Sequence, residues 1–364
     1  MNDELPPPVG RRSAGLALST MLLAGQAPSA LAQPVLPPPP APTGAPVPAA
    51  PVPPIGVNVG HEAIGIMGGP LVGTFTRIAD DIARFLALRA PHVARIIPMI
   101  GSGGPQVAQD VVELRSVDGA VVSAVVMDSI RRSGWLADVT RRVSYVAELY
   151  VEETHIVAST QISNVQALNG KVVNVGALGG GTEVIAKRLF EGLGVRPIFD
   201  NRPTLEALRG VQGGDPAAVV FIAGKPVAAF QDVPIVGNLH FVPITLDATT
   251  RPRVEPLFRQ TVIEHLDYPR FIPRGRTVPT VASSVFLVTR NHPDGSERQF
   301  WVSQIVTELV QSFVALRAGA ATGAYHPKWR EVNVLTPLVG YGRSPEVTAW
   351  FNNTGTSDPP ATPR

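Results

Sequence analysis

Three glycine-rich turns, each between a short apolar run and a helical stretch, most constrain how this 364-residue chain can fold. They lie at 68–74, 101–105 and 176–182. Glycine lets the backbone turn through positive φ and lets its amides approach a bound group closely. Because a helix follows each turn, free N–H groups at its N-terminus attract negative charge. Any one of these turns could simply reverse the chain, but together they predict a cradle for a carboxylate or similar anion.

Apolar runs alternate with helical stretches over most of the chain. We expect strands at 63–67, 95–100, 120–126, 142–151, 171–175, 217–222 and 281–288, and a long helix over 299–317. Such alternation is typical of mostly parallel sheets with helices on both faces. Two sets of elements, about 57–150 and 156–245, predict two α/β lobes with a cleft between them, and the strand at 281–288 returns the chain to the first lobe.

The beginning of the chain differs from the rest, since its first 54 residues hold 15 of the 37 prolines. Two arginines precede an uncharged apolar stretch, 13–25, and a run of small residues. These are the parts of a secretory signal peptide, for which we expect cleavage after Ala32. A buried helix and an uncleaved membrane anchor are the alternatives.

Residues 33–54 lack charge and are rich in proline, which predicts a polyproline II spacer. Such a segment could instead bind a proline-reading domain. At the other end, the polar residues 353–364 predict a disordered tail.

Composition and motifs exclude several kinds of site. The chain has no cysteine, which excludes disulfides, thiolate zinc sites, iron–sulfur clusters and cysteine nucleophiles. A net charge of +2 without a basic stripe argues against nucleic-acid binding. The turn at 176–182 lacks the Gly-Lys-[Ser/Thr] of a nucleotide P-loop, and the seven histidines are scattered. The carboxylate pair Glu152-Glu153 has no evident partner for glycosidase chemistry. We therefore expect no catalytic activity, no metal and no cofactor.

Lys225 is one of only four lysines and follows an apolar strand. Its ammonium could pair with a ligand carboxylate. The alternative is a solvent-exposed lysine at the start of a helix.

Short motifs along the folded part occur in a distinctive order and spacing. They are Gly68-Gly-Pro-Leu-Val-Gly-Thr-Phe75, Arg95-Ile-Ile-Pro-Met-Ile-Gly101, Tyr150-Val-Glu-Glu-Thr-His155, Gly170-Lys-Val-Val-Asn-Val175, Gly181-Thr182, Val220-Phe-Ile-Ala-Gly-Lys-Pro226, Leu239-His-Phe-Val-Pro243, Tyr268-Pro269 and Tyr325-His-Pro-Lys-Trp-Arg-Glu331. From about Ile64 to Phe351, the chain resembles the TAXI type (TRAP-associated extracytoplasmic immunogenic) of solute-binding protein.

The resemblance implies a periplasmic two-lobe α/β protein with a type II periplasmic-binding-protein fold. Lobe 1 would comprise 55–155 and 279–352, and lobe 2 would comprise 156–278, with hinges near 150–156 and 278–281. Such a protein, most often a monomer, closes on a small solute and delivers it to a TRAP-type membrane permease. Solutes of the family are mostly carboxylates such as glutamate or dicarboxylates. The implied ligand-binding residues are Gly73, Thr74, Phe75, Ser102, Gly103, Gly181, Thr182, Gly224, Lys225 and Pro226.

The chain departs from the family pattern at three places. Ser123-Ala124-Val125 stands where Gln-Ser-Asp is common, Gly179-Gly180-Gly181-Thr182 replaces Gly-Ser-Gly-Thr, and Gly103-Gly104-Pro105 replaces a more polar loop. Fewer side-chain donors imply a less polar ligand, a ligand held by backbone amides, or a fold kept without transport. The alternative function is therefore a stand-alone sensory or scaffold protein of the same fold.

Overall fold

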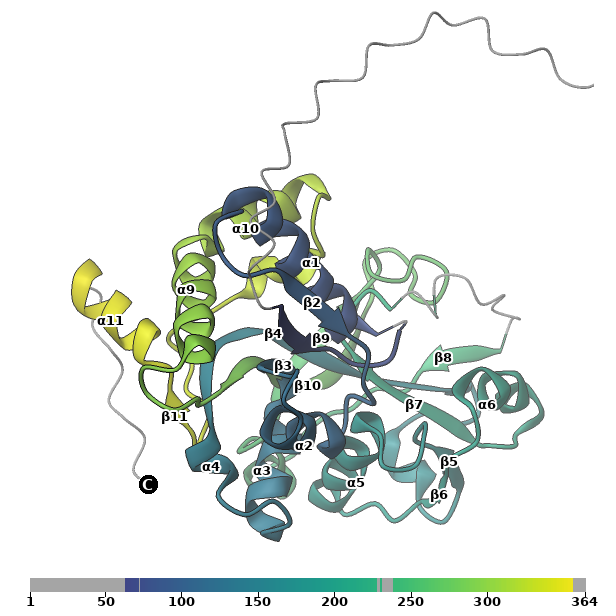
Figure 1. Ribbon diagram of the computed structural model, residues 1–364. Helices are drawn as coiled ribbons and strands as arrows, with labels where there is room; N and C mark the ends of the chain where they lie inside the picture. The colour runs from purple at the N-terminus through teal and green to yellow at the C-terminus, as the bar shows by residue number, and fades with distance from the viewer. Residues whose placement is uncertain (1–62, 72, 228–229, 231–237, 356–364) are drawn as a thin grey trace, which may run out of the picture. The chain divides into compact units, whose positions relative to one another are not determined.

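The computed structural model describes residues 63–71, 73–227, 230 and 238–355 (Figure 1). The expected signal peptide, 1–32, and the spacer, 33–54, lie outside these residues. Helix α11 extends to Thr354, so the first two residues of the expected tail are helical, and residues 356–364 lie outside the description.

Strands and helices alternate along the described residues. The strands are β1 (Ile64–Met67), β2 (Ile96–Met99), β3 (Gly119–Ser123), β4 (Val143–Ser159), β5 (Val172–Asn174), β6 (Ile198–Asp200), β7 (Ala218–Ala223), β8 (Leu239–Phe241), β9 (Arg259–Glu264), β10 (Thr277–Arg290) and β11 (Gly342–Arg343). The helices are α1 (Thr74–Arg89), α2 (Pro105–Glu113), α3 (Ala124–Ser133), α4 (Val139–Arg142), α5 (Gly181–Leu193), α6 (Thr204–Gly210), α8 (Arg251–Val254), α9 (Glu297–Gln311), α10 (Phe313–Thr322) and α11 (Pro345–Thr354), with 3-10 turns η1 (Val165–Leu168), η2 (Val211–Gly213) and η3 (Pro327–Glu331).

One continuous sheet runs through the molecule in the order β2-β1-β3-β10-β4-β7-β5-β6. Strands β1, β2 and β3 are parallel, β5, β6 and β7 are parallel, and β10 runs antiparallel to both β3 and β4. The sheet is therefore mixed, not mostly parallel, because two long strands join two parallel sets. This arrangement confirms the expected two-part α/β fold class.

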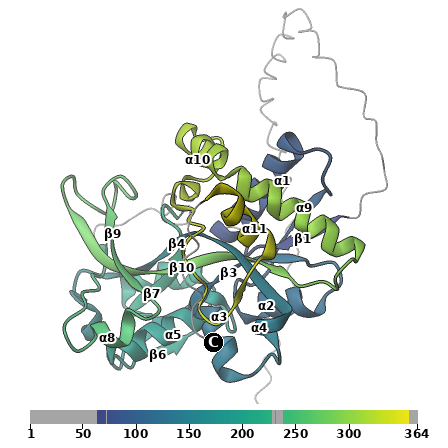
Figure 2. The ribbon, with the colours of Figure 1, turned by 90° about the vertical axis from the view of Figure 1, so that its left-hand side faces the viewer.

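The long strands β4 and β10 belong to both parts. The first part of β4 pairs with β10, and its last part pairs with β7 and β8. Figures 1 and 2 place α1, α9, α10 and α11 at one end of the sheet and α5 and β6 at the other. The expected lobe boundaries fall inside these continuous strands, and their exact positions stay a prediction.

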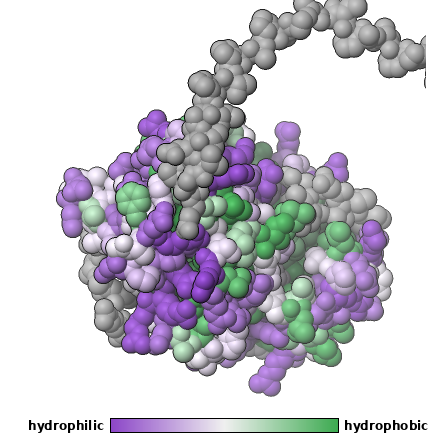
Figure 3. Space-filling model, in the orientation of Figure 1, coloured by the Kyte–Doolittle hydropathy of each residue, from purple (hydrophilic) through white to green (hydrophobic). Residues whose placement is uncertain are grey.

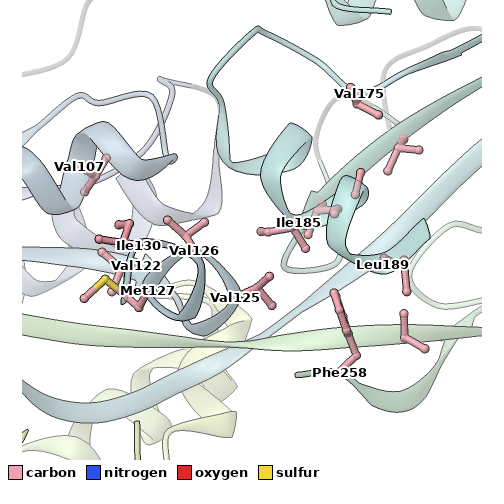
Figure 4. Packing of buried hydrophobic residues seen from close by; sticks show 14 of the residues in the cluster. Val107, Val122, Val125, Val126, Met127, Ile130, Val175, Ile185, Leu189 and Phe258 are labelled. Atoms are coloured by element: carbon pink, nitrogen blue, oxygen red, sulfur yellow. The ribbon is translucent and has the colours of Figure 1, made fainter. Parts of the chain in front are cut away.

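Apolar helix faces cover the sheet. In α1, Ile78, Ile82 and Leu86 recur at helical spacing and are buried with residues of α9 and α10. On the opposite face, α2, α3 and α5 contribute to one cluster, which includes Val125, Met127 and Ile185 (Figure 4). Since α3 and α5 follow strands of different parts, their packing joins the two parts.

Two sequence expectations need correction. The apolar run 120–126 is not one strand, because β3 ends at Ser123 and α3 begins at Ala124. A short apolar run does not by itself distinguish a buried strand from a buried helix. The expected helix over 299–317 is two helices, α9 and α10, which meet at Ser312.

Candidate functional site

The second and third glycine turns touch each other directly, although they belong to different parts of the sheet. A Cβ atom added at Gly104 would lie 2.3 Å from the carbonyl oxygen of Gly179, and one at Gly181 would lie 2.4 Å from that of Gly103. Real Cβ atoms do not approach other atoms so closely. Only residues without side chains allow this approach, so Gly104 and Gly181 bring the two backbones into contact.

The first turn meets the same region. The Thr74 hydroxyl, at the start of α1, donates a hydrogen bond to the carbonyl oxygen of Gly224, after β7, at 3.2 Å. A Cβ at Gly103 would lie 3.4 Å from Cδ of Pro70, so the first and second turns also adjoin. The N-termini of α1, α2 and α5 therefore gather where the two parts meet, and their amides can receive negative charge.

The structure gathers most of the expected site residues in this region. Gly73 precedes α1, and Phe75 lies edge-on to Tyr150, with ring centroids 6.5 Å apart. The Ser102 hydroxyl accepts a hydrogen bond from the amide of Gly104 at 3.3 Å. Thr182 follows Gly181 in the first turn of α5, and Pro226 follows Lys225. Their contact with a ligand stays a prediction.

Lys225 is paired within the protein. Its Nζ atom lies 2.8 Å from Oδ2 of Asp267 and 2.9 Å from the carbonyl oxygen of Val262. Its backbone amide donates to Oε2 of Glu153 at 2.9 Å. The ammonium of Lys225 is therefore paired with a carboxylate of the protein, that of Asp267, whereas the sequence suggested a ligand carboxylate as its partner.

A row of buried polar side chains crosses the sheet beside Gly224. Tyr150, Glu152 and Thr154 alternate along β4 and so share one face. Ser123, the last residue of β3, and Ser283 of β10 lie next to them in the strand register. All five side chains are buried. A Cβ at Gly224 would lie 3.0 Å from the Tyr150 ring, which places this polar row against the region where the turns meet.

Three hydroxyls of the polar row have no hydrogen-bond partner among the described residues: those of Ser123, Tyr150 and Thr154. A buried polar group without a partner costs roughly 1–3 kcal/mol. Such groups therefore require a physical explanation, and one explanation is that they bind a ligand.

The Ser283 hydroxyl donates a hydrogen bond to Oε1 of Glu152 at 3.0 Å, and the Ser123 hydroxyl lies near enough to favour the charged form of the same carboxyl. Burial raises the pKa of the Glu152 carboxyl from 4.5 to about 7, because a charge is poorly solvated there. The nearby hydroxyls and the cation of Lys328 counter this shift only in part.

The neighbouring carboxylate, Glu153, is neutralised by a lysine. Its Oε1 atom lies 2.6 Å from Nζ of Lys328, and both side chains are buried. Lys328 also contacts Glu331 at 2.7 Å, and Glu331 accepts a hydrogen bond from the amide of Val151 on β4. The segment η3 thereby covers the edge of β4 between the residues that pair with β11 and those that pair with β7.

Sequence reasoning identified the turns but not the polar row. The sequence placed the pair Glu152-Glu153 at a strand end, but β4 continues to Ser159 and the pair lies within it. Ser123 stood out in the sequence as a departure from the TAXI pattern. Ser283 lies 131 residues from Glu152, and no local signal connects them. Along the described part of the chain, no three His, Asp or Glu side chains form a group that could hold a metal ion.

The family profile that matches this chain extends over most of the folded part. A profile of the NMT1-like family matches residues 66–297, more than half of the sequence. The chain belongs to the NMT1-like family. The matched residues of this NMT1-like protein include the three glycine turns and the whole polar row. No curated protein matches the sequence.

Solved structures similar to this NMT1-like protein differ widely from it in sequence. The periplasmic aliphatic sulphonate binding protein SsuA from Escherichia coli is 14% identical, with a TM-score of 0.39 over 80% of this chain and 89% of that one. The GluR0 ligand-binding core from Nostoc punctiforme in complex with (L)-glutamate is 15% identical, with a TM-score of 0.40 over 74% and 99%. YhfZ from Shigella flexneri is 15% identical, with a TM-score of 0.42 over 72% and 91%. At such identities and TM-scores these likenesses carry no conclusion about the ligand.

The helices and the surface bear on whether the chain could contact a membrane. Each helix in the described ranges is too short or too polar to cross a lipid bilayer. Hydrophobic residues reach the surface on the face turned to the viewer in Figure 3. Leu71 and Leu178, in the first and third glycine turns, are among the exposed hydrophobic residues.

Proposed function

We propose that this chain is the non-catalytic, periplasmic solute-binding component of a TRAP-type transporter of the TAXI kind. It captures a small carboxylate-bearing solute between its two parts and delivers it to a membrane permease. The observation that carries the proposal is the convergence of the three glycine turns, with helix N-termini, where the parts meet. Free amides at helix N-termini are suited to a carboxylate.

In this proposal the contact between the second and third turns is the closed arrangement of the protein. The turns separate to admit solute, and the movement occurs where β4 and β10 pass from one part to the other, near 150–156 and 278–281. The solute carboxylate then replaces the direct contacts between the turns. Closure on a bound solute is a hinge motion of the usual kind.

A thermal-shift screen of the purified chain tests solute binding. The panel holds glutamate, small dicarboxylates, 2-oxo acids, aromatic carboxylates and neutral amino acids. A ligand at about 100 times its dissociation constant adds roughly 2.7 kcal/mol to stability, which raises the melting temperature measurably. The shift should be smaller in Thr182→Ala, in the third turn, and unchanged in Thr322→Ala, an exposed threonine at the end of α10.

The transport step needs a separate measurement. Cells that carry the chain and a TRAP-type permease should accumulate the solute found in the screen, and cells without the chain should not. A folded chain that binds no member of the panel contradicts solute capture. Binding without any effect on uptake contradicts only the transport step.

A further inference from the structure

Glu152 is a buried carboxylate beside the region where the glycine turns meet, and no described cation forms an ion pair with it. Buried acids elsewhere in the sheet have one: Glu148 pairs with Arg259, Glu153 with Lys328, and Asp118 with Arg298. The nearest groups that favour the charged form of Glu152 are hydroxyls, those of Ser123 and Ser283.

The cations nearest to this region are bound to other acids. Lys328 is bound to Glu153 and Glu331, and Lys225 is bound to Asp267. The charged groups that act on Glu152 are Glu153 on its own strand and Lys328 on η3, while β3 and β10 contribute only the hydroxyls of Ser123 and Ser283. Among the described residues, no cation is left to pair directly with Glu152, so its charge is balanced either by a proton or by a cation that enters with a ligand.

The groups around Glu152 match one kind of cation. An ammonium carries three hydrogen-bond donors and no acceptor. The carboxylate of Glu152 only accepts hydrogen bonds, and the hydroxyl oxygens of Ser123, Tyr150 and Thr154, which can also donate, are free to accept them in the same polar row. A second carboxylate placed here would be repelled by Glu152, whereas the amides of the glycine turns attract one.

We infer that the polar row binds the ammonium group of the solute, with Glu152 as its counter-ion. This inference rests on the proposed function and narrows its solute to an amine-bearing carboxylate, such as an α-amino acid. The glycine turns hold the carboxylate and the polar row holds the ammonium, so the solute is recognised through both of its charges. A dicarboxylate without an amine brings no cation to Glu152, so Glu152 must be protonated for that ligand to bind.

Calorimetric titration of the purified chain with matched ligands tests this assignment. The probes are L-glutamate, glutarate and 2-oxoglutarate, which share a five-carbon skeleton, and L-leucine with 4-methylpentanoate. The amine-bearing member of the pair that binds should bind at least about tenfold more tightly. Affinity for it should also rise with pH as Glu152 loses its proton. Equal affinity of both members, or weaker binding with rising pH, means that Glu152 is not the counter-ion.

Glu152→Gln keeps the shape of the side chain and removes its charge. It should reduce affinity for the amine-bearing ligand about tenfold or more and abolish the preference over the amine-free ligand. Glu148→Gln is the matched control, because Glu148 is a buried glutamate of the same strand that is already paired with Arg259. That variant should keep the preference.

The outcomes separate the two proposals. If the amine-free ligands bind as well as the amine-bearing ones, the ammonium site is wrong and solute capture stands. If Glu152→Gln keeps the full preference while folded, as judged by circular dichroism, the assignment of Glu152 is wrong. If no probe or panel member binds the folded chain, both proposals fall.

Discussion

The Nζ atom of Lys328 lies 2.6 Å from Oε1 of Glu153, and both side chains are buried. The other oxygen of Glu153 accepts the backbone amide of Lys225 at 2.9 Å. One carboxylate thus joins η3, β4 and the turn after β7. These three segments meet beside the glycine turns, so this ion pair supports the region that we assign to the solute.

Replacing Lys328 should destabilise the fold strongly. In Lys328→Met the buried Glu153 loses its cation, which typically costs about 3–5 kcal/mol in the free energy of unfolding. Arg141→Met is the control, because Arg141 pairs with Asp138 and both side chains are exposed, and such surface pairs contribute about 1 kcal/mol or less. Urea unfolding measures the loss of unfolding free energy in both variants. Equal losses would show that the buried ion pair contributes no more to stability than the surface pair.

Alanine at the touching glycines should force the turns apart. Gly104→Ala and Gly181→Ala each place a Cβ against a backbone carbonyl oxygen, and overpacking of this kind costs typically 1–3 kcal/mol. Gly213→Ala is the control, because a Cβ there has no atom within 4 Å. Thermal unfolding measures the stability of the three variants, and small-angle scattering detects any opening. An effect at Gly213 as large as at Gly181 contradicts the contact.

Glu152 should give the stability a distinct pH dependence. Burial raises the pKa of its carboxyl from 4.5 to about 7, so the folded chain holds this proton more tightly than the unfolded chain does. The contribution of Glu152 to the free energy of unfolding therefore falls as the pH rises through that interval. Glu152→Gln lacks this titration, and its stability relative to the wild type should rise by about 3 kcal/mol between these pH values.

Urea unfolding of both proteins without ligand, at steps from about pH 4.5 to about pH 7.5, measures the difference directly. Taking the difference cancels the histidines: burial lowers the pKa of His155 to about 3 and that of His326 to about 4, which acts in the opposite direction. A flat difference for Glu152→Gln would contradict the prediction.

The hydroxyl of Tyr268 should stabilise the second part of the sheet. Its hydroxyl accepts the amide of Val227 at 2.8 Å and contacts Nε2 of His155 at 2.9 Å, and both partners are buried. Tyr268→Phe leaves them unpaired, at roughly 1–3 kcal/mol for each group. Tyr325 is the control, because this tyrosine is only partly buried, and in Tyr325→Phe the free energy of unfolding should change by less than about 0.5 kcal/mol. Similar losses in the two variants would contradict the role of this hydroxyl.

The sequence by itself determined the alternation of strands and helices and the places where helices begin. Gly73 precedes α1, Pro105 starts α2 and Gly180 precedes α5, as the glycine and proline pattern predicts. These features depend on neighbours within one turn of the backbone, so a local pattern reports them. The break between β3 and α3 at Ser123 was missed, because both sides of that break are apolar and buried.

Only the tertiary structure decided which groups meet in the site. Ser283 donates to Glu152 from 131 residues away, and Lys328 reaches Glu153 across 175 residues. The same packing pairs Lys225 with Asp267, a contact that no spacing in the sequence predicts. A local pattern reports whether a side chain is buried, whereas strand register and long-range packing select its partner. The charge that remains without a partner at Glu152 could therefore be found only in the folded chain.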